Sequence, residues 1–241
     1  MIDLHCHLLP AIDDGARDLD EALAMARMAV EGGITHAVMT PHVMPGTFDN
    51  DLSTIEAAVA QHRDVLGQAG IPLEIHVGGE VRIGPEILTL HAEGRIPYLG
   101  TWEGEPVMLL ELPHSHIPPG SDKLVDWLRQ RGIRPLLAHP ERNPDIARDP
   151  SRLGAFVDQG CLVQVTAGSL VNDFGEIFRD AAMAMLEAGW VTVLASDAHR
   201  ADRRTPVIEP GRQVAARMVG EDASWRMVRD IPAAILGVAV E

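Results

Sequence analysis

The chain has 241 residues and a formal net charge of −15, from 20 basic and 35 acidic residues, and it carries 11 histidines. So acidic a net charge argues against a general nucleic-acid binder, which needs a basic face, and two cysteines are too few to staple a secreted scaffold. With 46% hydrophobic residues, no basic leader and no apolar run long enough to span a bilayer, the chain is expected to be one cytoplasmic domain over residues 1–241, without membrane insertion.

Short β-rich runs alternate with helical patterns along the whole chain. The predicted strands are 2–4, 36–39, 73–77, 107–112, 135–138, 162–165 and 191–194. The predicted helices are 19–31, 52–69, 85–91, 123–131, 152–158, 177–187 and 212–219. Asp18 or Asp20 can cap the first helix, and Ser121 can cap the fourth. Such βα units predict an α/β fold with a parallel sheet, closed into a distorted (β/α)7 TIM-like barrel, with a doubly wound open sheet as the alternative.

Residues of the types that bind metals follow most of the predicted strands. Six of the seven strands end in or near a histidine, aspartate or glutamate, and only the strand 162–165 does not. The residues in chain order are His5, His7, His42, Glu80, Glu111, His139, Asp197 and His199. Because active sites in βα barrels gather at the carboxyl ends of the strands, we expect these side chains to converge.

Imidazole and carboxylate groups are ligands of zinc, manganese and iron. His5 and His7 alternate on an extended segment, so both imidazoles can reach one ion. A carboxylate can also bridge two ions, which makes a site for two or more metals reasonable. His114 and His116 have the same spacing, but they lie in the proline-rich loop 113–120 and are interpreted as loop residues or as the outer part of a pocket.

Other catalytic chemistries are excluded by their missing motifs. A cysteine-dependent phosphatase needs an arginine six positions after its thiolate, and Cys6 and Cys161 have Ile12 and Ala167 there. The segment 166–170 is not the Gly-X-Ser-X-Gly elbow of a serine hydrolase, and no glycine-rich phosphate loop is present. A metal centre is therefore the favoured interpretation.

The order of these motifs resembles the PHP (polymerase and histidinol phosphatase) superfamily, and within it the CpsB/CapC/YwqE-type bacterial protein-tyrosine phosphatases. The resemblance runs from residue 1 to residue 205. The segments that carry it are 5–10, 12–15, 40–42, 79–82, 109–111, 138–142 and 196–199. It implies a distorted seven-stranded barrel with two or three divalent ions, manganese being preferred over zinc, iron or cobalt.

The resemblance also implies a ligand set for each ion. The first ion would take His5, His7, Glu80 and Asp197, the second Glu80, Glu111 and His139, and the third Asp14, His42 and His199. The choice of Asp14 over Asp13 comes from the family and not from spacing. Arg142 and Arg204 match arginines that bind phosphate, with Arg200 and Arg203 as alternatives for the second position.

The implied activity is hydrolysis of phosphotyrosine through attack of a hydroxide held between two ions. The implied substrate is the cytoplasmic tail of a membrane tyrosine autokinase for polysaccharide export, so the protein would regulate capsule or exopolysaccharide synthesis. The loops 44–51 and 114–122 are expected to rim an open site. The alternatives are a small-molecule phosphatase acting on substrates such as histidinol phosphate, a nuclease of the same superfamily, and a regulatory module without activity.

Overall fold

The strands form a closed ring of parallel neighbours. In the computed structural model, which describes residues 1–239, one sheet has the order β1-β2-β4 and the other β10-β9-β8-β7-β5-β3. The ring closes between β10 and β1, where Asp197 N donates to His5 O and His7 N donates to Ala198 O, both at 2.8 Å. This arrangement confirms the predicted distorted barrel; the last two residues of the predicted 1–241 domain lie outside the described residues. The strands are β1 (Ile2–Cys6), β2 (His36–Met39), β3 (His42–Val43), β4 (Glu74–Val77), β5 (Glu80–Arg82), β6 (Gly100–Trp102), β7 (Glu105–Glu111), β8 (Arg134–Ala138), β9 (Leu162–Thr166) and β10 (Val193–Ala195).

Two of the predicted strands of the ring are each continued, after a short break, by a second short strand. Residues 40–41 separate β2 from β3, and residues 78–79 separate β4 from β5. A Cβ atom on Gly78 would lie 2.5 Å from Val38 Cγ1, so only glycine allows the chain to pass this close to its neighbour. The break moves β3 and β5 into the second sheet, where His42 and Glu80 are register partners. Strands β3 and β5, and the antiparallel strand β6, were not predicted.

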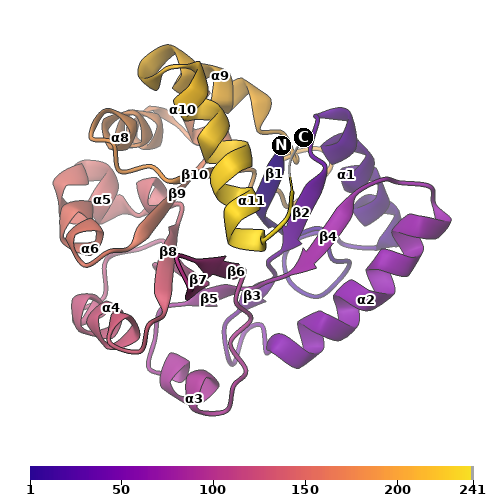
Figure 1. Ribbon diagram of the computed structural model, residues 1–241, viewed down its shortest axis with the longest axis horizontal. Helices are drawn as coiled ribbons and strands as arrows, with labels where there is room; N and C mark the ends of the chain where they lie inside the picture. Colours follow the sequence, from indigo (N-terminus) through magenta and orange to yellow (C-terminus); the bar gives the residue numbers. More distant parts are fainter. Residues whose placement is uncertain (240–241) are drawn as a thin grey trace.

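The longer helices surround the ring (Figure 1). Asp18 caps α1 as predicted, because its side chain accepts from Glu21 N. The predicted cap at Ser121 is wrong: Gly120 precedes α4 in a left-handed conformation, and the Ser121 hydroxyl donates to Pro118 O instead. Within residues 1–239, no helix combines the length and apolar character of a membrane span. The helices are α1 (Leu19–Glu31), α2 (Leu52–Gln68), α3 (Glu86–Ala92), α4 (Ser121–Arg129), α5 (Pro144–Arg148), α6 (Gly154–Asp158), α7 (Ala167–Leu170), α8 (Glu176–Glu187), α9 (Glu209–Val219), α10 (Glu221–Trp225) and α11 (Ile231–Leu236).

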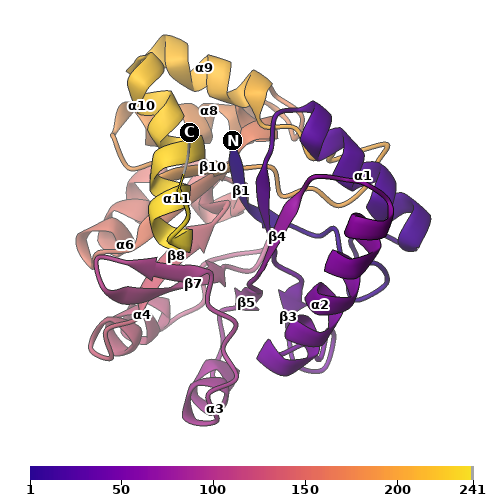
Figure 2. The same cartoon turned by 45° about the vertical axis from the view of Figure 1, so that its right-hand side comes forward.

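Apolar side chains from both sheets fill the interior of the ring. Ile2, Leu109 and Leu136 belong to one buried cluster together with Ala233 and Ile235 of α11. Helix α11 packs against β1 and β6 and crosses the ring in both views (Figure 1 and Figure 2). It therefore closes the end of the barrel at which the strands begin, and leaves the end at which they finish for the polar residues.

Candidate metal centre

All nine predicted metal ligands meet at the carboxyl ends of the strands. Within each of four groups, the ligand atoms lie within 4.8 Å of one another. The groups are His7, Asp14, His42 and His199; His5, His7 and Glu80; His5, His139 and Asp197; and His42, Glu80 and Glu111. Eight of the nine side chains are buried and only Asp14 is exposed. Residues spread over almost 200 positions of sequence thus form one cluster.

His5 and His7, at the end of β1, point their Nε2 atoms into this cluster. The two Nε2 atoms are 3.2 Å apart. His5 Nδ1 lies 3.0 Å from Gln164 Oε1, and His7 Nδ1 lies 2.6 Å from Asp13 Oδ2. Since both oxygens can only accept, each Nδ1 carries a proton, which leaves Nε2 as the nitrogen that can bind a cation once its own proton is released.

Glu80 lies at the junction of the groups. Its Oε1 is 2.8 Å from His139 Nε2, and its Oε2 is 2.8 Å from His42 Nδ1. The same Oε2 lies 3.5 Å from the Nε2 atoms of both His5 and His7. The β3–β5 register explains this position, because it sets Glu80 directly beside His42. A carboxylate that faces ligands on both sides has the geometry of a group that can bridge two ions.

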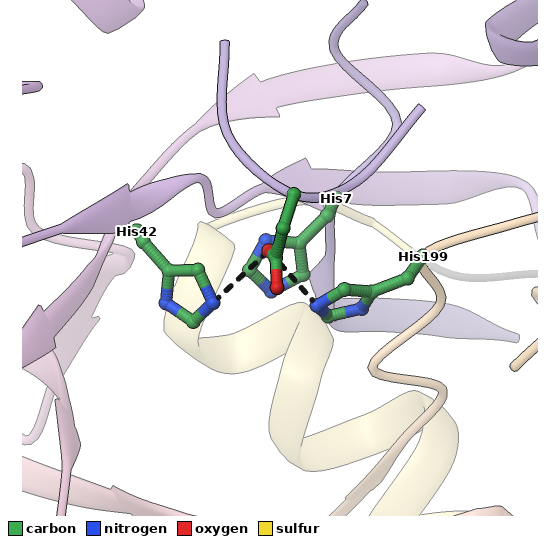
Figure 3. A group of neighbouring side chains, drawn as sticks. His7, His42 and His199 are labelled. Carbon is green, nitrogen blue, oxygen red and sulfur yellow. Dashed lines mark ion pairs between the residues drawn. The ribbon is translucent and has the colours of Figure 1, made fainter. Parts of the chain in front are cut away.

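Asp14, His42 and His199 form the most open group. Asp14 Oδ1 lies 3.3 Å from His42 Nε2 and 3.4 Å from His199 Nε2, and Figure 3 shows the imidazoles of His7, His42 and His199 converging. Asp13 instead contacts His7 and accepts from the backbone N–H of His42. The adjacent aspartates thus have different positions: Asp14 is in the cluster, while Asp13 orients one of its histidines.

Asp197 separates the imidazoles from two arginines. Its Oδ1 is 3.3 Å from His5 Nε2, while its Oδ2 accepts from Arg142 Nη1 and, at 2.6 Å, from Arg204 Nη2. Arg200 points away and pairs with Glu21 of α1 at 3.3 Å. Of Arg200, Arg203 and Arg204, only Arg204 forms a hydrogen bond or ion pair with a cluster residue within residues 1–239.

The backbone is strained at three of these residues. His139, Asp197 and Arg204 have φ values of 32°, 49° and 52°, in the left-handed region that side chains disfavour. Hydrogen bonds hold two of these turns, from His139 N to Gln164 Oε1 at 3.2 Å and from His199 N to Arg204 O at 2.9 Å. Strained backbone conformations persist where surrounding contacts hold them in place, and they are common at functional sites.

The cluster contains both neutral and protonated imidazoles. Burial, with a contribution from Arg142, lowers the pKa of His139 to about 3, and burial beside His7 lowers that of His199 to about 4. Burial acts in the same direction on His7 and His42, but Asp13 raises the pKa of His7 to about 9 and Glu80 raises that of His42 to about 11. The carboxylates thus attract positive charge, which protons supply here and a divalent cation could replace.

The residues fit a metal centre on a second ground. Four buried side-chain atoms in the cluster make no hydrogen bond of acceptable geometry among the described residues, although such groups are costly to leave unsatisfied. They are His42 Nδ1 and Glu80 Oε2, which face each other only as an ion pair at 2.8 Å, and Glu111 Oε1 and Asp197 Oδ1. All four are of the nitrogen and oxygen types that bind borderline divalent cations, so the set suits manganese, zinc or iron.

Three residues that contact and orient members of the cluster were not predicted from the sequence. Gln164 contacts both His5 and the backbone of His139, and it lies on the one strand for which no functional residue was predicted. A glutamine buried in an otherwise apolar strand was the available signal. Arg82 Nε donates to Glu111 Oε2 at 2.7 Å, and Asp13 was indistinguishable from Asp14 by spacing.

The two loops expected to rim the site each place one ring against it. Phe48 stacks on His42 with 5.5 Å between ring centroids, and His114 stacks on His139 at 5.6 Å. His114 Nε2 also lies 3.5 Å from Glu111 Oε1. Both cysteines are buried, which raises the pKa of Cys161 to about 12 and that of Cys6 well above its usual range, so neither supplies a thiolate.

Comparison with known proteins gives strong matches over almost the whole chain. The family model described as capsular polysaccharide synthesis, CpsB/CapC, matches residues 1–237. Tyrosine-protein phosphatase YwqE of Bacillus subtilis is 34% identical over 230 residues, which is 95% of this chain and 89% of the relative. Tyrosine-protein phosphatase CpsB of Streptococcus pneumoniae is 25% identical over 242 residues, covering 98% of both chains.

Solved structures give the same result. A chain from the crystal structures of YwqE and CpsB, described as unique metal-dependent tyrosine phosphatases, superposes with a TM-score of 0.91 and 32% identity, covering 100% of this chain and 96% of the other. A β-aspartyl dipeptidase from Fervidobacterium islandicum gives a TM-score of 0.60 at 17% identity over 98% of this chain and 72% of the other. The second similarity concerns the fold alone.

Proposed function

Because the chain belongs to the CpsB/CapC family, we propose that it is a metal-dependent protein-tyrosine phosphatase. The observation that carries the proposal is the division at Asp197. One oxygen of this carboxylate faces the cluster of imidazoles, and the other accepts from two arginines. A phosphate ester could therefore contact the cations and the arginines together.

The proposed ligands form three sets. His5, His7, Glu80 and Asp197 would hold one ion; Glu80, Glu111 and His139 a second; and Asp14, His42 and His199 a third. The short distances from Glu80 to His139 and from Asp14 to His42 and His199 support the last two sets. In the second set, Glu111 groups with His42 and Glu80 in space and not with His139, so a single ion there would have to draw these side chains together. We propose manganese, with two or three ions per chain.

When bound, such ions would lower the pKa of coordinated water and offset the charge of the phosphate. The chain's own contribution is to position these groups. Arg142 and Arg204 would bind the nonbridging oxygens of the phosphate through forked contacts that lysine cannot reproduce. Arg204 Nε is buried and has no hydrogen-bond partner among the described residues, so it has a donor to offer. The tyrosyl oxygen leaves with a pKa of about 10, so it needs little help from a general acid.

The physiological substrate is proposed to be the phosphorylated cytoplasmic tail of a membrane tyrosine autokinase that drives polysaccharide export. The family description, capsular polysaccharide synthesis, supports this assignment. Two buried free cysteines suit a reducing compartment, so we place the protein in the cytoplasm. We take residues 1–241 as one phosphatase domain, which the match over residues 1–237 supports.

A panel of substrates tests the activity. The manganese-loaded protein is assayed with a phosphotyrosyl peptide, a phosphoseryl peptide of the same sequence, and histidinol phosphate. The proposal predicts the highest kcat/KM on the phosphotyrosyl peptide. A higher kcat/KM on histidinol phosphate would assign the protein to small-molecule metabolism, and no turnover of any ester would indicate a regulatory module.

A further inference from the structure

A cavity of about 700 Å³ lies beside the metal centre and has no role in the chemistry described so far. Its walls come from the segment around α7, from the loop that follows His199, and from the start of α9. The apolar wall residues are Val171, Phe174, Val207 and Pro210. Arg203 and Arg204 supply positive charge to the lining, and Asp173 and Asp202 supply negative charge. The volume is in the range typical of small-molecule sites.

Two side chains connect this cavity to the phosphate-binding arginines. Arg204 both lines the cavity and donates to Asp197. The guanidinium of Arg142, which also donates to Asp197, lies over the ring of Phe174 with 4.9 Å between Cζ and the ring centroid. A phosphate held by both arginines would therefore lie at the mouth of the cavity, with Phe174 directly behind one of them.

Two glycines allow the walls to close around the cavity. A Cβ atom on Gly168 would lie 3.2 Å from Phe174 Cε2 and 2.8 Å from Asp173 Oδ2. One on Gly211 would lie 2.4 Å from Ala167 O, where α9 packs on α7. At Gly211 only the absence of a side chain permits this approach, because the contact is with backbone, while a side chain at Gly168 would have to displace those of Asp173 and Phe174.

The apolar walls are unusually open to solvent. Val171 and Val207 are 38% and 36% exposed and belong to the few large hydrophobic side chains that are exposed in the described part of the chain. Their exposure costs free energy in the free protein, which an apolar group entering the cavity would recover. Because Arg142 and Arg204 lie at the mouth, the apolar group that enters the cavity is expected to be attached to an anion.

We propose that this cavity binds the aromatic ring of the phosphotyrosine while Arg142 and Arg204 hold its phosphate. The inference rests on the proposed function and adds the origin of its selectivity. A single oxygen joins the ring to the phosphorus, so the ring enters whatever space begins at the arginines. Phosphoserine would place one methylene there and leave the walls of Val171, Phe174 and Val207 in water, so aryl phosphates are preferred.

The test uses phosphonates, which bind without being hydrolysed and so remove differences in leaving group. Calorimetry on the manganese-loaded protein compares phenylphosphonate with methylphosphonate. We expect the wild type to bind phenylphosphonate at least about tenfold more tightly, the size of effect that one missing apolar group has in a pocket. Val207→Ser and Val171→Ser remove apolar wall without adding charge, so they should remove this preference and leave the affinity for methylphosphonate unchanged. Ile177→Ser is the control, because Ile177 is exposed in the first turn of α8 and is not part of the cavity wall.

Equal affinities of the wild type for the two phosphonates would overturn the proposal, and so would an equal loss for both ligands in the Val207 and Val171 variants. Phe174→Leu keeps the apolar volume and loses the aromatic face, so it should retain most of the preference. The proposed phosphatase activity is judged separately. If the protein prefers phenylphosphonate but does not hydrolyse the phosphotyrosyl peptide, the role of the cavity is supported and the proposed phosphatase activity is wrong. If it hydrolyses the peptide but binds both phosphonates equally, the phosphatase activity is supported and the role of the cavity is wrong.

Discussion

The two ends of the strand ring carry opposite chemistry in the same strands. Strand β1 begins with Ile2 in the apolar interior and leads into His5 and His7, and β7 passes from Val107 to Glu111 in the same way. The starting end is closed by α11 with apolar side chains, while the finishing end collects imidazoles, carboxylates and arginines. The comparison teaches that stability and function are separable along each strand, so changes at the two ends should have different consequences.

The largest effect is expected from removing a candidate ligand at the polar end. His5→Ala should lower kcat/KM on a phosphotyrosyl peptide by more than about 100-fold, because a direct ligand should matter more than the outer partners that typically contribute 10–100-fold. His116→Ala is the matched control, since His116 has the same His-X-His spacing on an exposed loop. Near-normal activity of His5→Ala would break the assignment of this end.

A smaller loss of kcat/KM is expected when one of the phosphate-binding arginines is replaced. Arg142→Ala should lower kcat/KM by roughly 10²–10³-fold, the size of losing one dedicated donor to a developing negative charge. Arg142→Lys should recover only part of this loss, because lysine cannot form the forked contact. Arg200→Ala serves as control, because Arg200 pairs with Glu21 instead. Equal effects in the two alanine variants would show that general surface charge, and not position, is responsible.

A substitution of Gln164 tests whether the hydrogen bonds that orient the histidines contribute to metal affinity. Gln164→Leu removes the acceptor that orients His5 and holds the backbone of His139, and should weaken manganese binding by roughly 10–100-fold. A metal titration measures this directly, with Gln213→Leu as a control on the exposed part of α9. Unchanged metal affinity would mean that packing alone orients the histidines.

The apolar end should respond in stability and not in activity. Ile235→Ala empties part of the barrel interior beneath α11 and should lower the free energy of unfolding by about 2–5 kcal/mol. The kcat of the folded protein should stay at the wild-type value. Denaturant unfolding and the phosphatase assay on the same samples measure both, with the exposed Leu88→Ala as control. A large loss of kcat at full folding would show that the two ends are coupled.

The sequence predicts the ring and the position of the ligand-type residues because both follow from short-range patterns. Alternating strands and helices imply parallel strands, and strand ends then locate His139 and Asp197. The breaks after β2 and β4 were not predictable, because they depend on how closely Gly78 approaches Val38 in space. The different positions of Asp13 and Asp14 depend on a loop that folds back until a Cβ atom on Gly15 would lie 2.2 Å from His7 O.

The support behind the site was also hidden from the sequence. Gln164 is 25 residues from His139 and 159 residues from His5, and only the ring brings the three together. The apolar pattern of residues 231–237 fits both a closing helix and an interface, so the sequence does not decide between these two roles. The structure uses α11 within this segment to close the barrel.

Metal removal tests the central claim most directly. The protein is stripped with a chelator and manganese is returned in steps, while bound metal per chain and hydrolysis of a phosphotyrosyl peptide are measured on the same samples. We predict no activity in the stripped protein and recovery that follows the binding of two or three ions. Full activity in protein from which elemental analysis finds all metal removed would contradict the account.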